Sequence, residues 1–530
     1  MRRTDRAGLS RPSLAHLSVA CAAGALHAAG FGPWPHWLLA LAALSLLFAI
    51  MRRAAAQGAS PAAQALLAAA FAMVWFGVGL SWLYVSMHDV GGMPAPMAAA
   101  AVVLFSAYLS LYPAAASWLA WRGLHAPGPW QLAFRLAGAW TLAEMARGWV
   151  MTGFPWLAIG YGQIDGPLDG IAPLAGVYGI GALTVAVAAL VAWALPCGRD
   201  TDHAVNVRRA AQAVAAAVGL ACLPLASSPA QWTHATGPTL SVRLLQGNVP
   251  QALKFDPERA QRAMRDYLAG FESGTATLTI LPETAWTVPW NYTPEALTKR
   301  IETHVARGHA VAIGMPLLRT EPGSSAPRPT NSVTLFAAPN TGLPTPEPAV
   351  YDKRHLVPFG EFVPLGFRWF VQMMHIPLGD FGRGASTQRP FTVGGQRVAF
   401  NICYEDLFGE EIIDAVRGAS GATILANVSN IGWFGRSHAL PQHLQISRMR
   451  ALETGRPMLR ATNTGMTALI DAQGRVVAAL PPHEAGLLDV QVQGTEGLTP
   501  YVRTGNLGVL VVALAALLGT ATTRRRGLGG

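Results

Sequence analysis

The chain has 530 residues, of which 51% are hydrophobic and only 13% are charged, and its formal net charge at pH 7 is +10. A soluble domain usually carries about 25% charged residues, so this composition indicates a protein with a large membrane part. The length allows more than one domain. The basic residues do not cluster with aromatic residues in a soluble region, so nucleic acid is not an expected partner.

Long apolar runs fill the first part of the sequence and recur near its end. Runs of about 20 apolar residues are long enough to cross the hydrocarbon core of a bilayer. We predict a membrane domain over residues 1–226 with about seven transmembrane helices, and a final transmembrane helix over 505–522. The seven spans are expected near 12–30, 36–51, 62–87, 96–120, 130–150, 170–195 and 208–226.

Basic residues are concentrated in alternate loops between the predicted spans. Such residues accumulate in short cytoplasmic loops, and here they are Arg2, Arg3, Arg6, Arg11, Arg52, Arg53, Arg122, Arg199, Arg208, Arg209 and Arg524 to Arg526. We therefore expect both termini to face the cytoplasm and residues 227–495 to face the opposite side. Glu144 and Arg147 lie near the outer end of the fifth span, where an i, i+3 ion pair is a simpler interpretation than a functional site.

The pattern changes in residues 227–495, where short apolar or β-branched runs alternate with amphipathic segments, as is typical of a layered α/β domain. Predicted helices cover 257–273, 294–307, 408–418 and 438–455. Predicted strands cover 240–248, 277–283, 310–316, 331–339, 397–403, 422–430, 457–465 and 466–474. Residues 340–395 contain many Pro and Gly, so we predict a lid without regular elements there.

Three reactive side chains follow predicted strands in this region. "LTILPETAW" contains Glu283, "VYDKRHLVPFGEF" contains Lys353 and Glu361, and "VAFNICYEDLF" contains Cys403. Acyl transfer needs a thiolate nucleophile, a base that takes its proton, and a cation or N–H groups that hold the oxyanion. A lone buried cysteine is more often a small core residue, but the three side chains together favour catalysis. The other cysteines lie in or beside predicted spans, so Cys403 is expected to be a free thiol.

These motifs resemble those of a known enzyme superfamily. "LPETAW", "YDKRHLVPFGEFVP" and "NICYEDLF", in this order, are similar to the Glu–Lys–Cys signature of the nitrilase or carbon–nitrogen hydrolase superfamily. Further motifs resemble the bacterial apolipoprotein N-acyltransferase family, and they are "RGWVMTGFPWLAIGYGQ" (147–163), "LQGNVPQALKFD" (245–256), "NIGWFG" (430–435), "HLQISRMRALETGRPMLRATNTGMTALID" (443–471) and "TPYVRTGN" (499–506).

The resemblance implies a fold and a set of residue roles. It implies a nitrilase-like αββα sandwich inserted before the last transmembrane helix of a multi-span α-helical membrane domain. Glu283 would be the general base, Lys353 would stabilise the tetrahedral intermediate, and Cys403 would be the acylated nucleophile. Glu361, Glu405 and Tyr404 would support them, although a structural ion pair is an equal alternative for both glutamates. Lower-ranked candidates for substrate binding are the aromatic residues Trp433, Phe434, Phe359 and Phe255, the last at a position where the family usually has Trp.

The resemblance also implies the substrates and the location. The acyl donor would be a membrane phospholipid, and the acceptor would be the α-amino group of the N-terminal diacylglyceryl-cysteine of an apolipoprotein. The protein would lie in the bacterial inner membrane with its catalytic domain in the periplasm. The lid contains an apolar run over 367–378 that would contact the bilayer if it is exposed, although such a run is as often part of a core.

Two other functions remain open from the sequence. A membrane-tethered amidase or nitrilase would share the three catalytic residues but would not need eight spans. A transporter with a regulatory domain would need charged residues deep within several spans and paired broken helices, and it is the weaker alternative. No cofactor is expected, and the histidines show no metal-ligand spacing such as HExxH, so no metal is expected either.

Overall fold

The computed structural model describes residues 12–32, 36–124, 127–195, 203–222, 231–254, 256–320, 327–338, 348–364, 366–368 and 380–519. The chain divides into two compact units. The helical unit consists of residues 1–84, 94–227 and 506–530. The sheet unit consists of residues 85–93 and 228–505, so it includes a five-residue π-helix, η1 (Ser86–Val90), from the first half of the chain.

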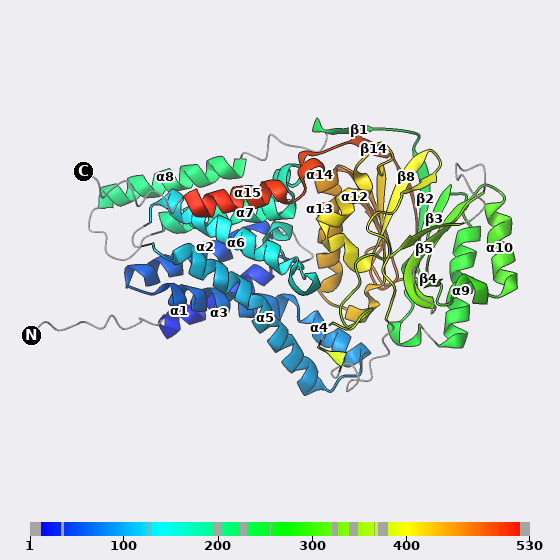
Figure 1. The fold of residues 1–530 in the computed structure, drawn as a ribbon, viewed down its shortest axis with the longest axis horizontal. Coiled ribbons are helices and arrows are strands. Elements are labelled where there is room, and N and C mark those ends of the chain that lie inside the picture. The colour runs from blue at the N-terminus through cyan, green and yellow to red at the C-terminus, as the bar shows by residue number, and fades with distance from the viewer. Residues whose placement is uncertain are drawn as a thin grey trace, which may run out of the picture. The chain divides into compact units, whose positions relative to one another are not determined.

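Long helices form the helical unit (Figure 1). α3 packs against α1 and α5, α7 packs against α2, α6 and α8, and the last helix, α15, packs against α6. The bounds are α1 (Leu14–Ala28), α2 (Trp37–Ala56), α3 (Pro61–Gly79), α4 (Trp82–Val85), α5 (Ala95–Trp121), α6 (Pro129–Arg147), α7 (Ala172–Ala194), α8 (His203–Cys222) and α15 (Leu507–Gly519).

Small residues allow close approach where these helices cross. A Cβ atom at Gly138 of α6 would lie 2.5 Å from the carbonyl oxygen of Ala513 in α15. At the crossing of α1 and α3, a Cβ atom at Gly24 would lie 2.1 Å from the carbonyl oxygen of Phe71. Only glycine fits at these two positions, and such contacts are the usual means of packing helices in a membrane.

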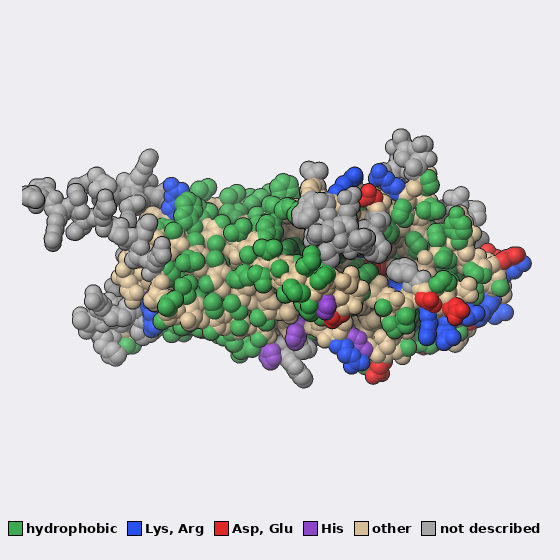
Figure 2. Space-filling model, turned by 90° about the horizontal axis from the view of Figure 1, so that it is seen from below, with side chains coloured by type: hydrophobic (Ala, Val, Ile, Leu, Met, Phe, Trp, Pro, Cys, Tyr) green, Lys and Arg blue, Asp and Glu red, His purple; other side chains and the backbone are tan. Residues whose placement is uncertain are grey.

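Seven of the eight predicted spans each correspond to one helix. The span predicted at 62–87 is too long, because α3 ends at Gly79 and the short helices α4 and η1 follow it. Among the described residues, four helices could cross a membrane by length and composition, within 37–56, 61–79, 95–121 and 169–194, while those at 14–28, 210–222 and 507–519 are shorter. α6 carries three charged residues, which lower its hydropathy. The predicted total of eight spans therefore stays a prediction. The surface of the helical unit is largely hydrophobic on the face seen in Figure 2, as a lipid-facing surface would be.

The charged residues of α6 are buried and partnered. Glu144 and Arg147 form the predicted i, i+3 pair, with 3.4 Å between Arg147 Nη2 and Glu144 Oε1. Arg147 Nη1 also donates to the carbonyl oxygens of Phe154 and Trp156, and the N–H of Ile159 donates to Glu144 Oε1 at 2.9 Å. The pair therefore holds the loop that follows α6, which is a structural role.

Two six-stranded sheets form the centre of the sheet unit. The first has the order β13-β2-β3-β4-β5-β6, the second has the order β12-β11-β10-β9-β8-β7, and β1 pairs with β14 in a separate ribbon. The bounds are β1 (Thr233–Ala235), β2 (Leu240–Gln246), β3 (Leu278–Ile280), β4 (Ala310–Thr320), β5 (Pro327–Phe336), β6 (Ala349–Asp352), β7 (Phe391–Val393), β8 (Gln396–Ile402), β9 (Ile424–Ser429), β10 (Met458–Thr462), β11 (Ala468–Ile470), β12 (Val476–Ala479), β13 (Gly486–Val492) and β14 (Thr495–Gly497).

The two sheets pack face to face with helices on their outer faces (Figure 1). Alternate Val, Leu and Ile side chains of both sheets share one buried core, because successive residues of a strand point to opposite faces. α9 (Pro257–Glu272) and α10 (Glu295–Val305) cover the first sheet, and α12 (Gly409–Val416) and α13 (Ala439–Thr454) cover the second. The predicted αββα sandwich is confirmed.

The lid prediction needs a correction. Residues 340–395 were expected to lack regular elements, but β6 and β7 both lie within them. β6 pairs with β5, with Asp352 opposite Ser332, and β7 pairs with β8 across a Gly394–Gly395 turn. Each strand is at a sheet edge and has only three or four residues, which is too short for a clear alternation. Most of the apolar run at 367–378 lies outside the described residues.

Candidate functional site

The sheets deliver the three predicted catalytic residues at strand ends. Glu283 follows β3 and Lys353 follows β6, both in the first sheet. Cys403 follows β8 in the second sheet and begins a 3-10 helix, η10 (Cys403–Leu407). Both halves of the sandwich therefore contribute to one cluster, and the site lies within the sheet unit.

Lys353 is the centre of a buried ionic cluster. Its side chain is only 1% exposed, and its Nζ lies 2.9 Å from Glu361 Oε1 and 3.5 Å from Glu283 Oε1. Burial alone would lower the pKa of this ammonium, but the Glu361 and Glu283 carboxylates together outweigh burial and raise it above its usual range. Lys353 is therefore a permanent cation. A lysine ammonium has three N–H donors, and these two carboxylates account for two of them.

Asn331 joins the two carboxylates of this cluster, and sequence reasoning missed it. Its Nδ2 donates to Glu283 Oε1 and to Glu361 Oε1, each at 2.7 Å. Asn331 lies on β5, and its carbonyl oxygen accepts the backbone N–H of Lys353 at 2.7 Å. The second carboxylate oxygen of Glu283 accepts the N–H of Asn430 at 2.8 Å. The Glu283 carboxylate is thus fixed from three sides.

Cys403 adopts a strained backbone conformation. Its φ is +53°, in the left-handed region that non-glycine residues rarely occupy. Asn248, Thr284 and Phe359 share this feature, and each lies in one of the sequence motifs singled out above. Strain of this kind often gathers at active sites, where the surrounding structure enforces it.

The Cys403 thiol is neutral in the resting site. Burial, followed by the nearby Glu283 carboxylate, raises its pKa well above the usual range, and Lys353 only partly opposes this. The proton must leave Cys403 as the sulfur attacks, and Glu283 is the carboxylate held in place to receive it.

Glu405 braces the backbone around the site. Its Oε1 accepts the N–H groups of Arg354 and His355 at 2.6 and 3.0 Å, and its Oε2 accepts the N–H of Ile402 and the hydroxyl of Tyr351 at 2.6 and 2.9 Å. These bonds link the segment after Lys353 to the residue before Cys403. Burial raises the pKa of the Glu405 carboxyl, and the backbone N–H groups oppose this shift.

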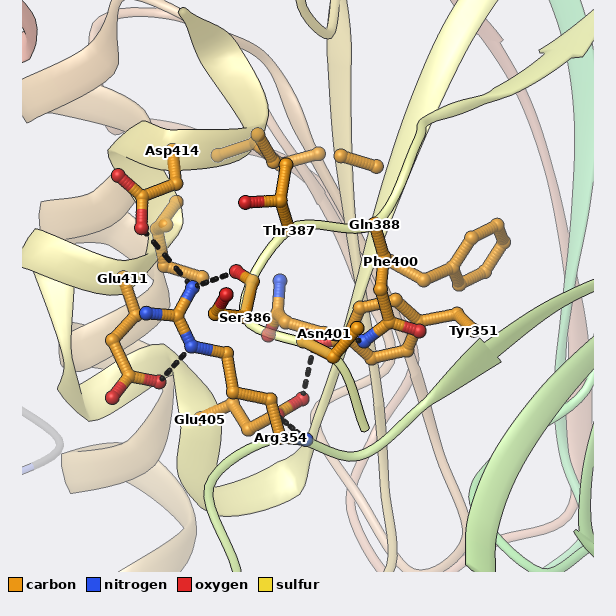
Figure 3. Close-up of a pocket in the computed structure, with 15 residues that line it drawn as sticks. Tyr351, Arg354, Ser386, Thr387, Gln388, Phe400, Asn401, Glu405, Glu411 and Asp414 are labelled. Carbon is orange, nitrogen blue, oxygen red and sulfur yellow. Dashed lines mark hydrogen bonds and ion pairs between the residues drawn. The ribbon is translucent and has the colours of Figure 1, made fainter. Parts of the chain in front are cut away.

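A cavity of about 40 Å³ lies beside Glu405 (Figure 3). Arg354 crosses it and contacts Glu411 at 3.2 Å, Asp414 at 3.1 Å and the carbonyl oxygen of Ser386 at 2.6 Å. Two carboxylates and a carbonyl oxygen therefore hold this guanidinium through Nε and Nη1, and the cavity supports the position of the Lys353 segment.

Lys254 is a second buried cation that sequence reasoning missed, although it lies in the "QALKFD" motif. Its Nζ donates to the carbonyl oxygen of Glu283 at 3.1 Å. Burial lowers the pKa of Lys254 to about 8, while Glu283 and Cys403 favour its charged form. Lys254 can therefore add positive charge to the site when a tetrahedral oxyanion forms, and it loses that charge in mildly alkaline solution.

The rate of Cys403 acylation is expected to fall as the pH rises through about 8, because Lys254 then becomes neutral. In Lys254→Arg, the guanidinium stays charged throughout this range, so this alkaline decrease should be absent. The measurement is the initial rate of acyl-enzyme formation from pH 6 to 9.5, followed by intact mass. The same decrease in both proteins would show that another group is responsible.

The predicted aromatic residues differ in their surroundings. Tyr404 is buried against the rings of His355 and Phe408, with centroid distances of 5.8 and 5.3 Å. Phe359 contacts Phe367 at 5.4 Å. Trp433 is 41% exposed on η11 (Ile431–Phe434), next to Phe434. Phe255 lies outside the described residues. A substrate-binding role for these residues stays a prediction.

Comparisons with known proteins add independent information. A family model described as "Apolipoprotein N-acyltransferase N-terminal domain" matches residues 23–190, and one described as "Carbon-nitrogen hydrolase" matches residues 195–501. A protein of Bordetella bronchiseptica named apolipoprotein N-acyltransferase is 45% identical, and the alignment covers 95% of this chain and 97% of the relative. A protein of Ralstonia nicotianae with the same name is also 45% identical, with 96% and 93% covered.

A carbon–nitrogen hydrolase superfamily protein of Xanthomonas campestris is 19% identical, and the match covers 54% of this chain and 97% of that chain with a TM-score of 0.36.

Proposed function

Because the chain belongs to the apolipoprotein N-acyltransferase family, we propose that it transfers a fatty acyl chain to the amino terminus of apolipoproteins through a thioester on Cys403. The observation that carries the mechanism is the buried Lys353 cluster, in which one ammonium is held between the carboxylates of Glu283 and Glu361 beside the thiol. This cluster supplies the base and the cation that acyl transfer from a neutral thiol requires.

The first half-reaction forms the thioester. Cys403 Sγ attacks the ester carbonyl carbon of a phospholipid, and its proton passes to Glu283. Lys353, with its third N–H donor, stabilises the oxyanion of the tetrahedral intermediate. The intermediate then expels the lysophospholipid alkoxide, which takes the proton back from Glu283. The carbon–oxygen ester bond is broken, and a carbon–sulfur bond is formed.

The second half-reaction uses the same groups, with the amine as nucleophile and the Cys403 sulfur as leaving group. The α-amino nitrogen of the N-terminal diacylglyceryl-cysteine attacks the thioester, and Glu283 accepts a proton from that nitrogen. Collapse of the intermediate forms the amide and breaks the carbon–sulfur bond, and Glu283 gives its proton to the leaving sulfur. Because the lysophospholipid leaves before the acceptor enters, ping-pong kinetics are expected.

The location is also proposed. The apolar helical unit supports placement in the bacterial inner membrane, with residues 1–226 and 505–522 in the membrane domain and residues 227–495 as the catalytic domain. The alternate distribution of arginines supports cytoplasmic termini and a periplasmic catalytic domain. Both lipid substrates would then present their reactive groups at the outer face of the bilayer.

One experiment separates acyl transfer from hydrolysis of a small carbon–nitrogen substrate. The purified full chain in detergent micelles is given phospholipid with a radiolabelled acyl chain and a diacylglyceryl-cysteinyl lipopeptide. We expect the label to appear on the lipopeptide nitrogen, with little release of free fatty acid. A lipopeptide whose amino terminus has been acetylated beforehand should receive no label. Release of free fatty acid at the same rate with or without lipopeptide, or ammonia from simple amides, would favour a hydrolase.

A further inference from the structure

Four buried polar side chains form a network at the Cys403 backbone. They are Asp406 of η10, His443 and Ser447 of α13, and Arg460 of β10, and each is at most 1% exposed. His443 and Ser447 are four residues apart, so they share one face of α13. Arg460 and Ser447 are hydrogen-bonded, and Asp406 accepts from Ser447. The network therefore joins a helix, a strand and the turn that carries the nucleophile.

The hydrogen bonds determine the protonation pattern of the His443 ring. Arg460 Nη2 lies 3.1 Å from His443 Nδ1, and a guanidinium can only donate, so Nδ1 must accept. The ring hydrogen is therefore on Nε2. That nitrogen lies 3.0 Å from Asp406 Oδ1 and 3.2 Å from the carbonyl oxygen of Cys403, so its N–H is directed at both acceptors.

The Cys403 carbonyl oxygen accepts a second side-chain donor. Asn427 Nδ2 lies 3.2 Å from it and 2.6 Å from Asn401 Oδ1. Two side chains thus hold one peptide group, and that peptide belongs to the residue with φ of +53°. A buried ion pair is weak evidence for stability, because desolvation offsets its attraction. This network has a different consequence, because it holds the main chain of Cys403. Fixing that main chain also fixes the direction in which the Cys403 side chain points.

We propose that His443, oriented by Asp406 and Arg460, is a positioning residue that holds the Cys403 main chain in its left-handed conformation for attack. The inference rests on the proposed acyl transfer through Cys403. His443 is expected to affect the rate of the nucleophilic step and not the binding of lipid, because it contacts the backbone of Cys403 from within the core. A small displacement of a reacting atom is enough to slow such a step by large factors.

The test compares His443→Leu with His443→Gln. Leucine removes the donor, whereas the glutamine amide nitrogen can replace Nε2. In detergent micelles with phospholipid, the initial rate of acyl-enzyme formation is expected to fall about 10- to 100-fold in His443→Leu, as for loss of a hydrogen bond to a positioned group. The KM for phospholipid should be unchanged, and His443→Gln should recover much of the rate. His304→Leu, a buried histidine on α10 outside the site, is the matched control and should keep the rate.

A second readout is independent of lipid. The rate at which iodoacetamide alkylates Cys403, measured on its peptide, should fall in His443→Leu and recover in His443→Gln. A folded His443→Leu with wild-type acylation and alkylation rates would overturn the inference, and so would a His443→Gln no better than leucine. If His443→Leu does not fold, Ser447→Ala replaces it, with a several-fold decrease expected and an unchanged rate overturning the inference. If wild type forms no acyl-enzyme while the alkylation pattern holds, the proposed function fails and the positioning role stands.

Discussion

Wild-type protein incubated with phospholipid is expected to gain the mass of one fatty acyl chain, and Cys403→Ala is expected to gain none. The residue supplies the atom that carries the acyl group, and no other described side chain in the Lys353 cluster is a nucleophile of comparable strength. Transfer to the lipopeptide should fall by at least about 10³-fold, which is typical for loss of a covalent nucleophile. Intact-mass spectrometry before and after incubation checks the first result, and label transfer checks the second.

A matched cysteine variant makes this comparison specific. Cys222 is exposed on α8 in the helical unit, and Cys222→Ala removes the same atoms away from the site. This variant should acquire the acyl increment as wild type does. Hydroxylamine should release the increment from both proteins, because thioesters are cleaved readily by strong nucleophiles. An increment that persists in Cys403→Ala would place the acyl group on another residue and contradict the mechanism.

Replacing Lys353 with methionine is expected to damage both activity and folding. Without the ammonium, the Glu283 and Glu361 carboxylates would share the amide hydrogens of Asn331 with no cation between them. Removing one partner from a buried ion pair typically lowers the free energy of unfolding by about 3–5 kcal/mol. Loss of the oxyanion donor should reduce the rate of acyl-enzyme formation by about 10²- to 10³-fold. Thermal unfolding in detergent and time-resolved intact mass measure the two effects.

The control for this variant is a lysine that also forms an ion pair but is solvated. Lys299 on α10 pairs with Glu295 at 2.6 Å, and its side chain is 69% exposed. Lys299→Met should change the free energy of unfolding by less than about 1 kcal/mol and leave acylation unchanged. If Lys353→Met were as stable and as fast as Lys299→Met, the buried cluster would be neither the structural centre of the site nor its oxyanion donor.

The central strands of the sandwich were predictable, but its edges were not. All eight predicted strands were observed, and they are the four interior strands of each large sheet, with clear apolar runs in strands such as β2 and β9. The missed strands of the two large sheets, β6, β7, β12 and β13, are the four edge strands. β6, β7 and β12 have only three or four residues, and Asp489 and Gln491 interrupt the apolar residues of β13, so none of the four gave a clear strand pattern.

The sequence allowed us to predict the reactive residues of the site. It did not allow us to predict the residues that support them with hydrogen bonds. Glu283, Lys353 and Glu361 meet as the motif order implied. Asn331 and Lys254 were missed, because an amide in a strand and a lysine in a loop are ordinary surface features until the fold buries them. The Gly394–Gly395 turn is a hairpin signal that the sequence did contain and that was missed.

The packing of α15 against α6 can form only late in the synthesis of this protein. About 280 residues separate the end of α8 from the start of α15, so the ribosome needs roughly 15–60 s to supply the last helix after the others have been made. Until then, the face of α6 around Gly138 has no partner from the chain. The nascent helices must meanwhile be shielded by lipid or by the insertion machinery. A truncation that removes the last 25 residues should therefore leave the helical unit incompletely packed and open to proteolysis, even though it keeps all the proposed catalytic residues.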